Sequence, residues 1–286
     1  MRKRYIIGLV TAVLFISAYG AYHVYKSVAL VELTDENTTE TANSEDFPNV
    51  EIIEVKSDGR LLPDLVPLPP QDLEIVMDGG RTLLVFSTTY YNIGEGTLEL
   101  IADPETATDT ERTVFQRIYK TDGTYTDRDS GMFLWHQPHL HYHFSDFVDY
   151  ALEPVNSGES KVSGIREKST FCIRDVSRVE IEGSFTEEPA KYVVCGKERQ
   201  GVSVGWGDTY FSDYPDQNMD ITNIPSGTYT LSFDVNPLDR FDEITKENNI
   251  SSVTFNLNKE LGNVDIISTY PENPPEFEHI HIEQEF

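Results

Sequence analysis

The chain has 286 residues, a formal net charge of −27 and a sequence pI near 4.4. Its hydrophobic fraction of 38% and aromatic fraction of 11% are typical of a folded globular protein and exclude a wholly disordered chain. The acidic excess excludes nucleic acid as a natural partner and favours cationic ligands such as amines, although adaptation of the surface to salt explains it equally well.

The N-terminus has the pattern of an export segment. Arg2-Lys3-Arg4 precedes an uncharged, largely apolar run over residues 5–25, which predicts an N-terminal apolar helix. Residues 1–25 are either a signal peptide, cleaved after Ala18-Tyr19-Gly20, or a transmembrane anchor, because the run is just long enough to span a bilayer. Either way the rest of the chain faces outward, secreted or anchored in the periplasm or at the cell surface, and only this segment meets the membrane.

Residues 26–60 are polar and acidic and lack hydrophobic periodicity, so they predict a flexible stalk. From residue 61 onward, short segments rich in β-branched and aromatic residues alternate with turn residues, which predicts strands. These segments are residues 82–92, 97–101, 114–120, 147–152, 170–173, 192–194, 229–235 and 253–257.

No segment beyond residue 30 has a helical period, so the predicted fold class is all-β, a β-sandwich with long loops over residues 61–260. Residues 261–286 form a tail rich in proline and glutamate. Within it, His279 and His281 belong to a stretch that is an edge strand, a loose end or a weak metal site.

Export places the only two cysteines, Cys172 and Cys195, in an oxidising compartment. A disulfide between them would restrain the unfolded chain by roughly 3 kcal/mol on the loop-entropy account. Two free buried thiols are the alternative.

Four of the seven histidines lie within eight residues, at His136, His139, His141 and His143. The last three alternate with other residues, and a period of two places alternating side chains on one face of a strand. Since imidazole binds copper, zinc, iron or nickel, the pattern predicts a transition-metal site; a solvated face without metal is the alternative. On a straight strand His139 and His143 would lie roughly 13 Å apart. One ion can therefore reach all three histidines only if the strand bends, and Pro138 just upstream favours an irregular start.

The run WHQPHLHYHFSDFVDY at 135–150 resembles the copper-binding segment of the lysyl oxidase family of copper and quinone amine oxidases. Four further segments resemble that family's catalytic domain in the same order. They are LPDLVP at 62–67, KSTFC at 168–172, QGVSVGWGDTY at 200–210, and 220–249 with its Asn236-Pro237 and Asn248-Asn249 pairs. The resemblance therefore implies a lysyl oxidase-like catalytic domain over residues 61–260.

The resemblance implies a Cu²⁺ ion on His139, His141 and His143, with His136 orienting a ligand. It also implies a lysine tyrosylquinone cofactor made from Lys168 and Tyr210. A phenol near copper and O2 can be oxidised to a quinone, and a desolvated lysine amine can add to that ring. Taken alone, a surface lysine and a core tyrosine are the ordinary interpretations of these two residues.

The implied reaction converts primary amines, or lysyl side chains of extracellular proteins, to aldehydes with O2 and releases hydrogen peroxide and ammonia. Asp208 is a candidate base, and a turn cap is the alternative. Pro138 and Asp149 stand where animal enzymes have a cysteine and a histidine. Cys195 matches the distant partner of that cysteine, so its bridge is either rewired to Cys172 or absent. The chain thus resembles a bacterial or archaeal type, and the role of Asp149 stays open.

The resemblance also places a structural Ca²⁺ ion on hard oxygen ligands. The residues that match are Asp64, the Leu65 carbonyl, Glu243, Asn248 and Asn249. Thr245 replaces one acidic ligand of the family, and a hydrogen-bonded turn without metal is the alternative.

A different functional class also fits part of the chain. The turn at 92–96 and the loop at 236–249 resemble those of CARDB-type, Ig-like cell-surface modules, in which the histidines would hold a non-catalytic metal. The enzyme interpretation is favoured because such a module has no need of Lys168 and Tyr210 at matching positions.

Overall fold

The computed structural model describes residues 58–155, 165–179, 189–274 and 278–279. The predicted apolar helix over residues 1–25 and nearly all of the predicted stalk lie outside these residues. Within them, we find no helix whose length and apolar character would let it cross a bilayer. The chain from Leu61 onward forms one compact unit, and the account that follows concerns this unit.

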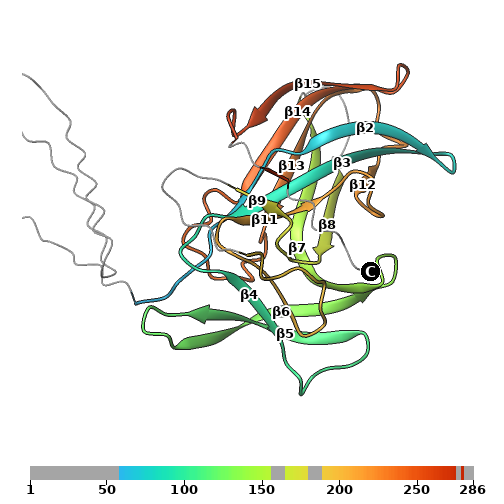
Figure 1. Ribbon diagram of the computed structural model, residues 1–286. Coiled ribbons are helices and arrows are strands. Elements are labelled where there is room, and N and C mark those ends of the chain that lie inside the picture. Colours follow the sequence, from blue (N-terminus) through green and yellow to red (C-terminus); the bar gives the residue numbers. More distant parts are fainter. Residues whose placement is uncertain (1–57, 156–164, 180–188, 275–277, 280–286) are drawn as a thin grey trace, which may run out of the picture. The chain divides into compact units, whose positions relative to one another are not determined.

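The described part of this unit is all-β, which confirms the predicted fold class. Its strands form two sheets, of seven and nine strands, and every strand pairing is antiparallel (Figure 1). The described residues contain no α-helix. The two sheets share one hydrophobic core, as expected for a sandwich.

The smaller sheet is built around the long strand β3 (Arg81–Asn92). Near its end β3 pairs with β1 (Leu65–Pro67) and β11 (Trp206–Tyr210), and near its start with β2 (Gln71–Asp78) and β12 (Asn218–Asp220). Beyond β11 the sheet continues through β9 (Ser177–Arg178) to β16 (Glu278–His279). Flanked on both edges, the second half of β3 is continuously buried.

The larger sheet has strand order β10-β4-β5-β6-β7-β13-β14-β15, and β8 pairs with β7 off this path. The bounds are β10 Arg199–Val202, β4 Leu98–Ala102, β5 Glu111–Tyr119, β6 Tyr125–His136, β7 His141–Pro154, β8 Ile165–Phe171, β13 Gly227–Val235, β14 Ile250–Asn258 and β15 Asn263–Tyr270. Strand β7 therefore contacts β6, β8 and β13, which makes it the strand where the histidine hairpin meets the rest of the sheet.

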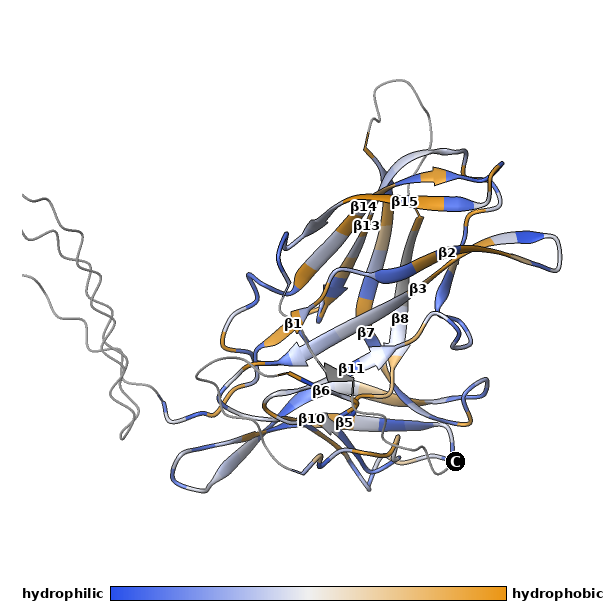
Figure 2. Ribbon diagram, turned by 45° about the horizontal axis from the view of Figure 1, so that its top comes forward, coloured by the Kyte–Doolittle hydropathy of each residue, from blue (hydrophilic) through white to orange (hydrophobic). Residues whose placement is uncertain are grey.

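Alternation along β13 shows why these sequences form a sandwich. Tyr229, Leu231, Phe233 and Val235 are buried while the residues between them are more exposed, and Figure 2 shows hydrophobic and hydrophilic positions alternating along β13 and β14. Burying each such side chain stabilises the fold by about 1.5–3 kcal/mol.

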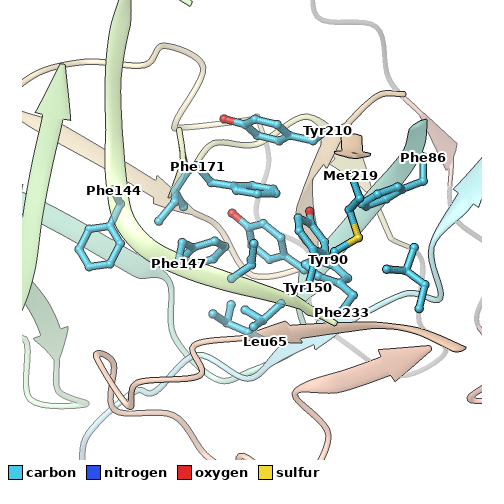
Figure 3. Packing of buried hydrophobic residues seen from close by; sticks show 14 of the residues in the cluster. Leu65, Phe86, Tyr90, Phe144, Phe147, Tyr150, Phe171, Tyr210, Met219 and Phe233 are labelled. Carbon is cyan, nitrogen blue, oxygen red and sulfur yellow. The ribbon is translucent and has the colours of Figure 1, made fainter. Parts of the chain in front are cut away.

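Aromatic rings join the two sheets at the centre of the core. The ring centroids of Phe86 and Tyr150 are 5.1 Å apart, and those of Tyr90 and Phe147 are 4.8 Å apart (Figure 3). Because β3 supplies one ring of each pair and β7 the other, these contacts set the position of one sheet on the other.

Strands β3, β4, β5, β13 and β14 confirm the predictions for their segments, and residues 147–152 lie within β7. The strand predicted at 170–173 lies earlier in the chain, as β8. The strand predicted at 192–194 is wrong: this segment is irregular. The Asp175 carboxylate accepts hydrogen bonds from the N–H groups of Lys191 and Tyr192, so a side chain replaces a partner strand there.

Candidate metal centre and tyrosine site

The histidine motif forms a hairpin, which differs from the single strand that its alternation predicts. Strand β6 ends at His136, residues 137–140 form the turn, and β7 begins at His141. The placement of His139 on a strand is therefore wrong. Leu140 has a φ of 57°, a left-handed conformation that reverses the chain. Because of this reversal, His139 and His143 are not held apart as they would be along a straight strand.

Three imidazoles converge at this hairpin. His139 Nδ1 lies 3.1 Å from His143 Nε2, and His141 Nε2 lies 2.9 Å from the same atom. Two nitrogens that each bind one ion at about 2.0–2.1 Å, roughly at right angles, are separated by about 3 Å. The spacing of the three ring nitrogens therefore fits a shared transition-metal ion.

The electrostatics of the cluster also suit a metal. Burial lowers the pKa of His141 to about 4 and that of His143 to about 2, and the neighbouring imidazoles act in the same direction. Both rings are therefore neutral at physiological pH, and a neutral imidazole has the lone pair that a metal needs.

The remaining ring nitrogens have partners that orient the rings. His139 Nε2 lies 3.0 Å from the Pro215 carbonyl oxygen, which can only accept, so Nε2 carries the proton and Nδ1 keeps its lone pair. His143 Nδ1 lies 3.0 Å from Thr170 Oγ1 on β8. With its proton on Nδ1, His143 turns the lone pair of Nε2 toward the other two rings.

His136 is a fourth imidazole beside this cluster. Its ring centroid lies 4.3 Å from that of His143, and a ligand nitrogen of each of His136, His139 and His143 falls within one group 4.8 Å across. His136 Nε2 lies 3.5 Å from an Asp216 carboxylate oxygen. The His141 nitrogen is 2.9 Å from His143 Nε2, and Asp216 already engages Nε2 of His136, so His141 fits the third position of the cluster better than His136 does.

Tyr210 lies next to the histidines, as the last residue of β11. Its ring centroid is 6.1 Å from that of His143 and 3.8 Å from that of Phe171, on which it packs (Figure 3). The phenol oxygen accepts a hydrogen bond of 2.6 Å from the Cys172 N–H. Burial raises the pKa of Tyr210 well above its ordinary value, so the phenol is neutral.

Lys168 lies on β8, and its backbone is in register with Asp149 on β7. The side chain of Lys168 is outside the part of the chain that the structure describes. Thr170, two residues later on the same strand, contacts His143, and Phe171 packs on Tyr210. One short strand therefore brings the predicted cofactor lysine, a histidine contact and a tyrosine contact together in sequence.

Asp208 is fully buried within β11, two residues before Tyr210. Its position inside a strand rules out the turn-cap interpretation. One carboxylate oxygen accepts a hydrogen bond from the Thr209 N–H, and Oδ2 is buried without a hydrogen-bond partner among the described residues. Burial raises the pKa of Asp208 to about 8, against the opposing effect of the Arg174 charge.

The residues of the predicted calcium site also lie together. Asn248 Nδ2 donates to Asp64 at 2.9 Å, while Asn249 Nδ2 and the Leu65 N–H each donate to Glu243 at 3.0 Å. The side-chain oxygens of Asn248 and Asn249 are buried and have no hydrogen-bond partner among the described residues. Burial raises the pKa of Asp64, and raises that of Glu243 to about 7. Two buried carboxylates and two unpaired amide oxygens fit a hard cation.

The predicted disulfide is confirmed: Cys172 and Cys195 are joined, with an S–S distance of 2.07 Å. Sequence reasoning missed the orienting contacts of Thr170, Pro215 and Asp216. Thr170 could have been found, because it lies within the KSTFC segment beside Lys168. Pro215 and Asp216 carry no spacing signal, since they lie more than seventy residues from the histidines that they contact.

Comparison with known proteins places this site in a family. The family model described as lysyl oxidase matches residues 115–266, which include the histidines, Lys168, Asp208, Tyr210 and both cysteines. The chain is 34% identical to human (Homo sapiens) lysyl oxidase homolog 4 over 160 residues, 56% of this chain and 16% of that protein. It is 35% identical to chicken (Gallus gallus) protein-lysine 6-oxidase over 117 residues, 41% of this chain and 26% of that protein.

Human lysyl oxidase homolog 1 is 32% identical over 196 residues, 63% of this chain and 30% of that protein. The chain thus spans less than a third of the length of these curated relatives. Since the family model covers more than half of the chain, and the region that it covers holds the converging histidines and Tyr210, this chain belongs to the lysyl oxidase family.

Proposed function

We propose that this protein is an exported copper- and quinone-dependent amine oxidase. It converts primary amines, or lysyl side chains of extracellular proteins, to aldehydes with O2 and releases hydrogen peroxide and ammonia. The observation that carries the proposal is the convergence of three imidazole nitrogens beside the buried phenol of Tyr210. Family membership, and relatives named protein-lysine 6-oxidase, support the same class of reaction.

The proposed copper ligands are His139 Nδ1, His141 Nε2 and His143 Nε2. Imidazole sets bind copper, zinc, iron and nickel. Copper is the proposed choice because the resemblance to the lysyl oxidase family implies it, and because oxidation of a phenol by O2 needs a redox-active ion. Pro215 and Thr170 hold two of the rings with the required nitrogens directed at one point.

The proposed organic cofactor is lysine tyrosylquinone, made from Lys168 and Tyr210; when formed, it supplies an electrophilic carbonyl that takes electrons from an amine. The chain's own residues prepare the tyrosine for this role. Phe171 packs on one face of its ring, and the Cys172 N–H holds its hydroxyl. Strand β8 carries Lys168 into the sheet three residues before Phe171.

Asp208 is the proposed group that takes a proton from the substrate. A general base works best when its pKa lies near the working pH, and burial raises the pKa of Asp208 to about 8. Its Oδ2 has no hydrogen-bond partner among the described residues and is therefore available to accept a proton.

A structural Ca²⁺ ion is proposed at Asp64, the Leu65 carbonyl, Glu243, Asn248 and Asn249. The support is the pair of buried carboxylates together with the two unpaired amide oxygens. Export is proposed from the apolar run at residues 5–25, and the Cys172–Cys195 disulfide fits an oxidising compartment.

Peptide mass spectrometry of the copper-loaded protein tests the proposal directly. The expected result is a crosslinked pair of peptides that contain Lys168 and Tyr210, in protein that absorbs visible light, reacts with hydrazines and releases peroxide with small primary amines. Protein that binds metal stoichiometrically but forms neither crosslink nor peroxide would instead match the non-catalytic cell-surface module.

A further inference from the structure

We propose that Cys172, Cys195 and His141 form a second metal site, selective for Cu(I), when the disulfide is reduced. In the oxidised chain the sulfurs are bonded to each other, so they cannot act as thiolate ligands. One ring nitrogen of His141 and the two sulfur atoms nevertheless lie within 4.8 Å of one another. Reduction therefore leaves two thiols and an imidazole gathered at one point.

The donor set determines which ion this site takes. Thiolates are soft ligands that select Cu(I) and Zn²⁺ among biological metals, and two thiolates with one imidazole satisfy the low coordination number of Cu(I). Cys172 is 1% exposed, and Cys195 and His141 are half-buried. Burial limits an ion here to the ligands that the protein supplies, and three ligands suffice for Cu(I) but leave Zn²⁺, which is almost always four-coordinate in structural sites, one ligand short.

Hydrogen bonds as well as the disulfide tie the two cysteine segments together. Directly after Cys172, the Ile173 N–H donates to Gln200 Oε1 at 3.0 Å. Directly after Cys195, the Gly196 carbonyl oxygen accepts from Gln200 Nε2 at 3.1 Å. The Asp175 carboxylate also accepts hydrogen bonds from the N–H groups of Lys191, Tyr192 and Ser203. Gln200 and Asp175 therefore tie the residues next to Cys172 to those next to Cys195.

His141 links this site to the proposed Cu²⁺ centre. Its Nε2 lies 2.9 Å from His143 Nε2, so the same imidazole belongs to both groups of ligands. In the oxidised chain His141 is available only to the histidine cluster. In the reduced chain the thiolate pair adds a second set of ligands beside His141, so the state of the disulfide decides whether a further ion can bind there.

The chemistry balances with a dithiol as the reductant. Two electrons from the dithiol convert the Cys172–Cys195 disulfide to two thiols, while the dithiol becomes its own disulfide. Binding of Cu(I) to both sulfurs then releases two protons and involves no further electron transfer. This inference adds to the proposed amine oxidase, whose centre uses the oxidised chain.

The test uses the full-length chain under anaerobic conditions. The protein is reduced with dithiothreitol, desalted, and titrated with Cu(I) in competition with bicinchoninate, while the untreated disulfide form is titrated in parallel. We expect the reduced chain to take up one more equivalent of Cu(I) than the oxidised chain, with sulfur in the X-ray absorption spectrum. The double variant C172S/C195S should lack both the extra equivalent and the sulfur signal.

His141→Ala is the matched test of the nitrogen ligand, with His136→Ala as its control. Reduced His141→Ala should bind the extra Cu(I) more weakly, whereas reduced His136→Ala should bind it as wild type does. Near-UV circular dichroism of the reduced protein checks that the fold survives, as the Gln200 and Asp175 contacts require.

Loss of the near-UV signal on reduction would overturn the proposal, as would Cu(I) uptake that is equal in the double serine variant. Failure of the amine oxidase proposal is measured separately, in the oxidised wild type, through Cu²⁺ content and peroxide release. A chain that binds Cu²⁺ and oxidises amines yet shows no sulfur-bound Cu(I) after reduction would contradict only the second site.

Discussion

The backbone N–H of Cys172 donates a 2.6 Å hydrogen bond to the phenol oxygen of Tyr210. This contact ties the end of β11 to the residue that follows β8, and so joins the disulfide to the tyrosine beside the histidines. It also positions the Tyr210 ring 3.8 Å from the Phe171 ring, which limits how far the phenol can turn.

The first prediction concerns the replacement Tyr210→Phe. We expect normal copper content and complete loss of the crosslink, colour and peroxide release, because the ring without its oxygen cannot become the quinone. The buried Cys172 N–H would lose its acceptor, at a cost to stability of about 1–3 kcal/mol. Metal analysis, peptide mass spectrometry and urea unfolding check the three parts. Full amine oxidase activity in this variant would show that the cofactor lies elsewhere.

The second prediction separates the three proposed metal ligands from the neighbouring His136. Alanine at His139, His141 or His143 should abolish stoichiometric copper after dialysis, because each removes one of the three converging nitrogens. His136→Ala should keep its copper and lose part of the activity. Metal analysis of these four single variants, and of a triple alanine variant of His139, His141 and His143, checks this. Copper retained by the triple alanine variant, or lost completely from His136→Ala, would contradict the assignment.

The third prediction concerns Thr170, whose hydroxyl lies 3.0 Å from His143 Nδ1. Outer contacts of this kind typically change metal affinity by about 10–100-fold. We expect Thr170→Val to weaken copper binding within this range, because His143 Nδ1 loses its hydroxyl partner. Competitive copper titration measures the change, and a shift in the copper electron paramagnetic resonance spectrum reports altered ring orientation. Thr170→Ser should behave as wild type; if both variants bind copper equally, the hydroxyl has no orienting role.

The fourth prediction is a pH dependence of stability from Asp208. Burial raises its pKa in the folded chain from an ordinary 3.8 to about 8, so the folded chain binds this proton more tightly than the unfolded chain does. The tighter binding of this proton therefore stabilises the folded chain fully below about pH 4. As the pH rises toward 8 this stabilisation is lost, by up to about 1.4 kcal/mol of unfolding free energy per pH unit.

Asp208→Asn removes this carboxyl while keeping its shape, so the variant should lose less stability than wild type between pH 5 and pH 8. Urea midpoints at several pH values measure the difference. Glu105→Gln, which removes an exposed carboxyl, is the matched control and should follow wild type. If Asp208→Asn loses stability with pH as steeply as wild type does, Asp208 does not keep its proton in the folded chain. If Asp208 is the base, the rate of amine oxidation by Asp208→Asn should also be about 10²–10⁴-fold lower than that of wild type.

The fifth prediction concerns the cluster around Glu243. Ca²⁺ should raise the thermal midpoint relative to EGTA-treated protein, since an ion that binds only the folded chain stabilises it, by about 2.7 kcal/mol at a hundred times its dissociation constant. Glu243→Gln should abolish this response, and the exposed Glu260→Gln should keep it. An equal response to Ca²⁺ in both variants would place the ion elsewhere.

Much of the fold could be predicted because local patterns and the tertiary structure agree. The alternation at 229–235 requires one buried face, and β13 has that face buried. Strands β2 and β6 were missed because polar residues interrupt their alternation; β2 is largely exposed, and β6 is supported by cross-strand contacts such as the Arg117–Asp127 ion pair. Strand β15 was also missed, because it lies in the stretch that the sequence assigns to the tail. Its pairing with β14 depends on that neighbouring strand and not on a pattern of its own.

The sequence by itself determined the chemistry that is present: the imidazoles, a phenol, two cysteines and hard oxygen ligands, each in a recognisable segment. Only the tertiary structure decided how they meet. His139 reaches His143 because a turn reverses the chain between β6 and β7. Tyr210 lies beside His143 because β11 pairs with β3, β8 pairs with β7, and the two sheets pack on each other. Such contacts link residues tens of positions apart, and no local period encodes them.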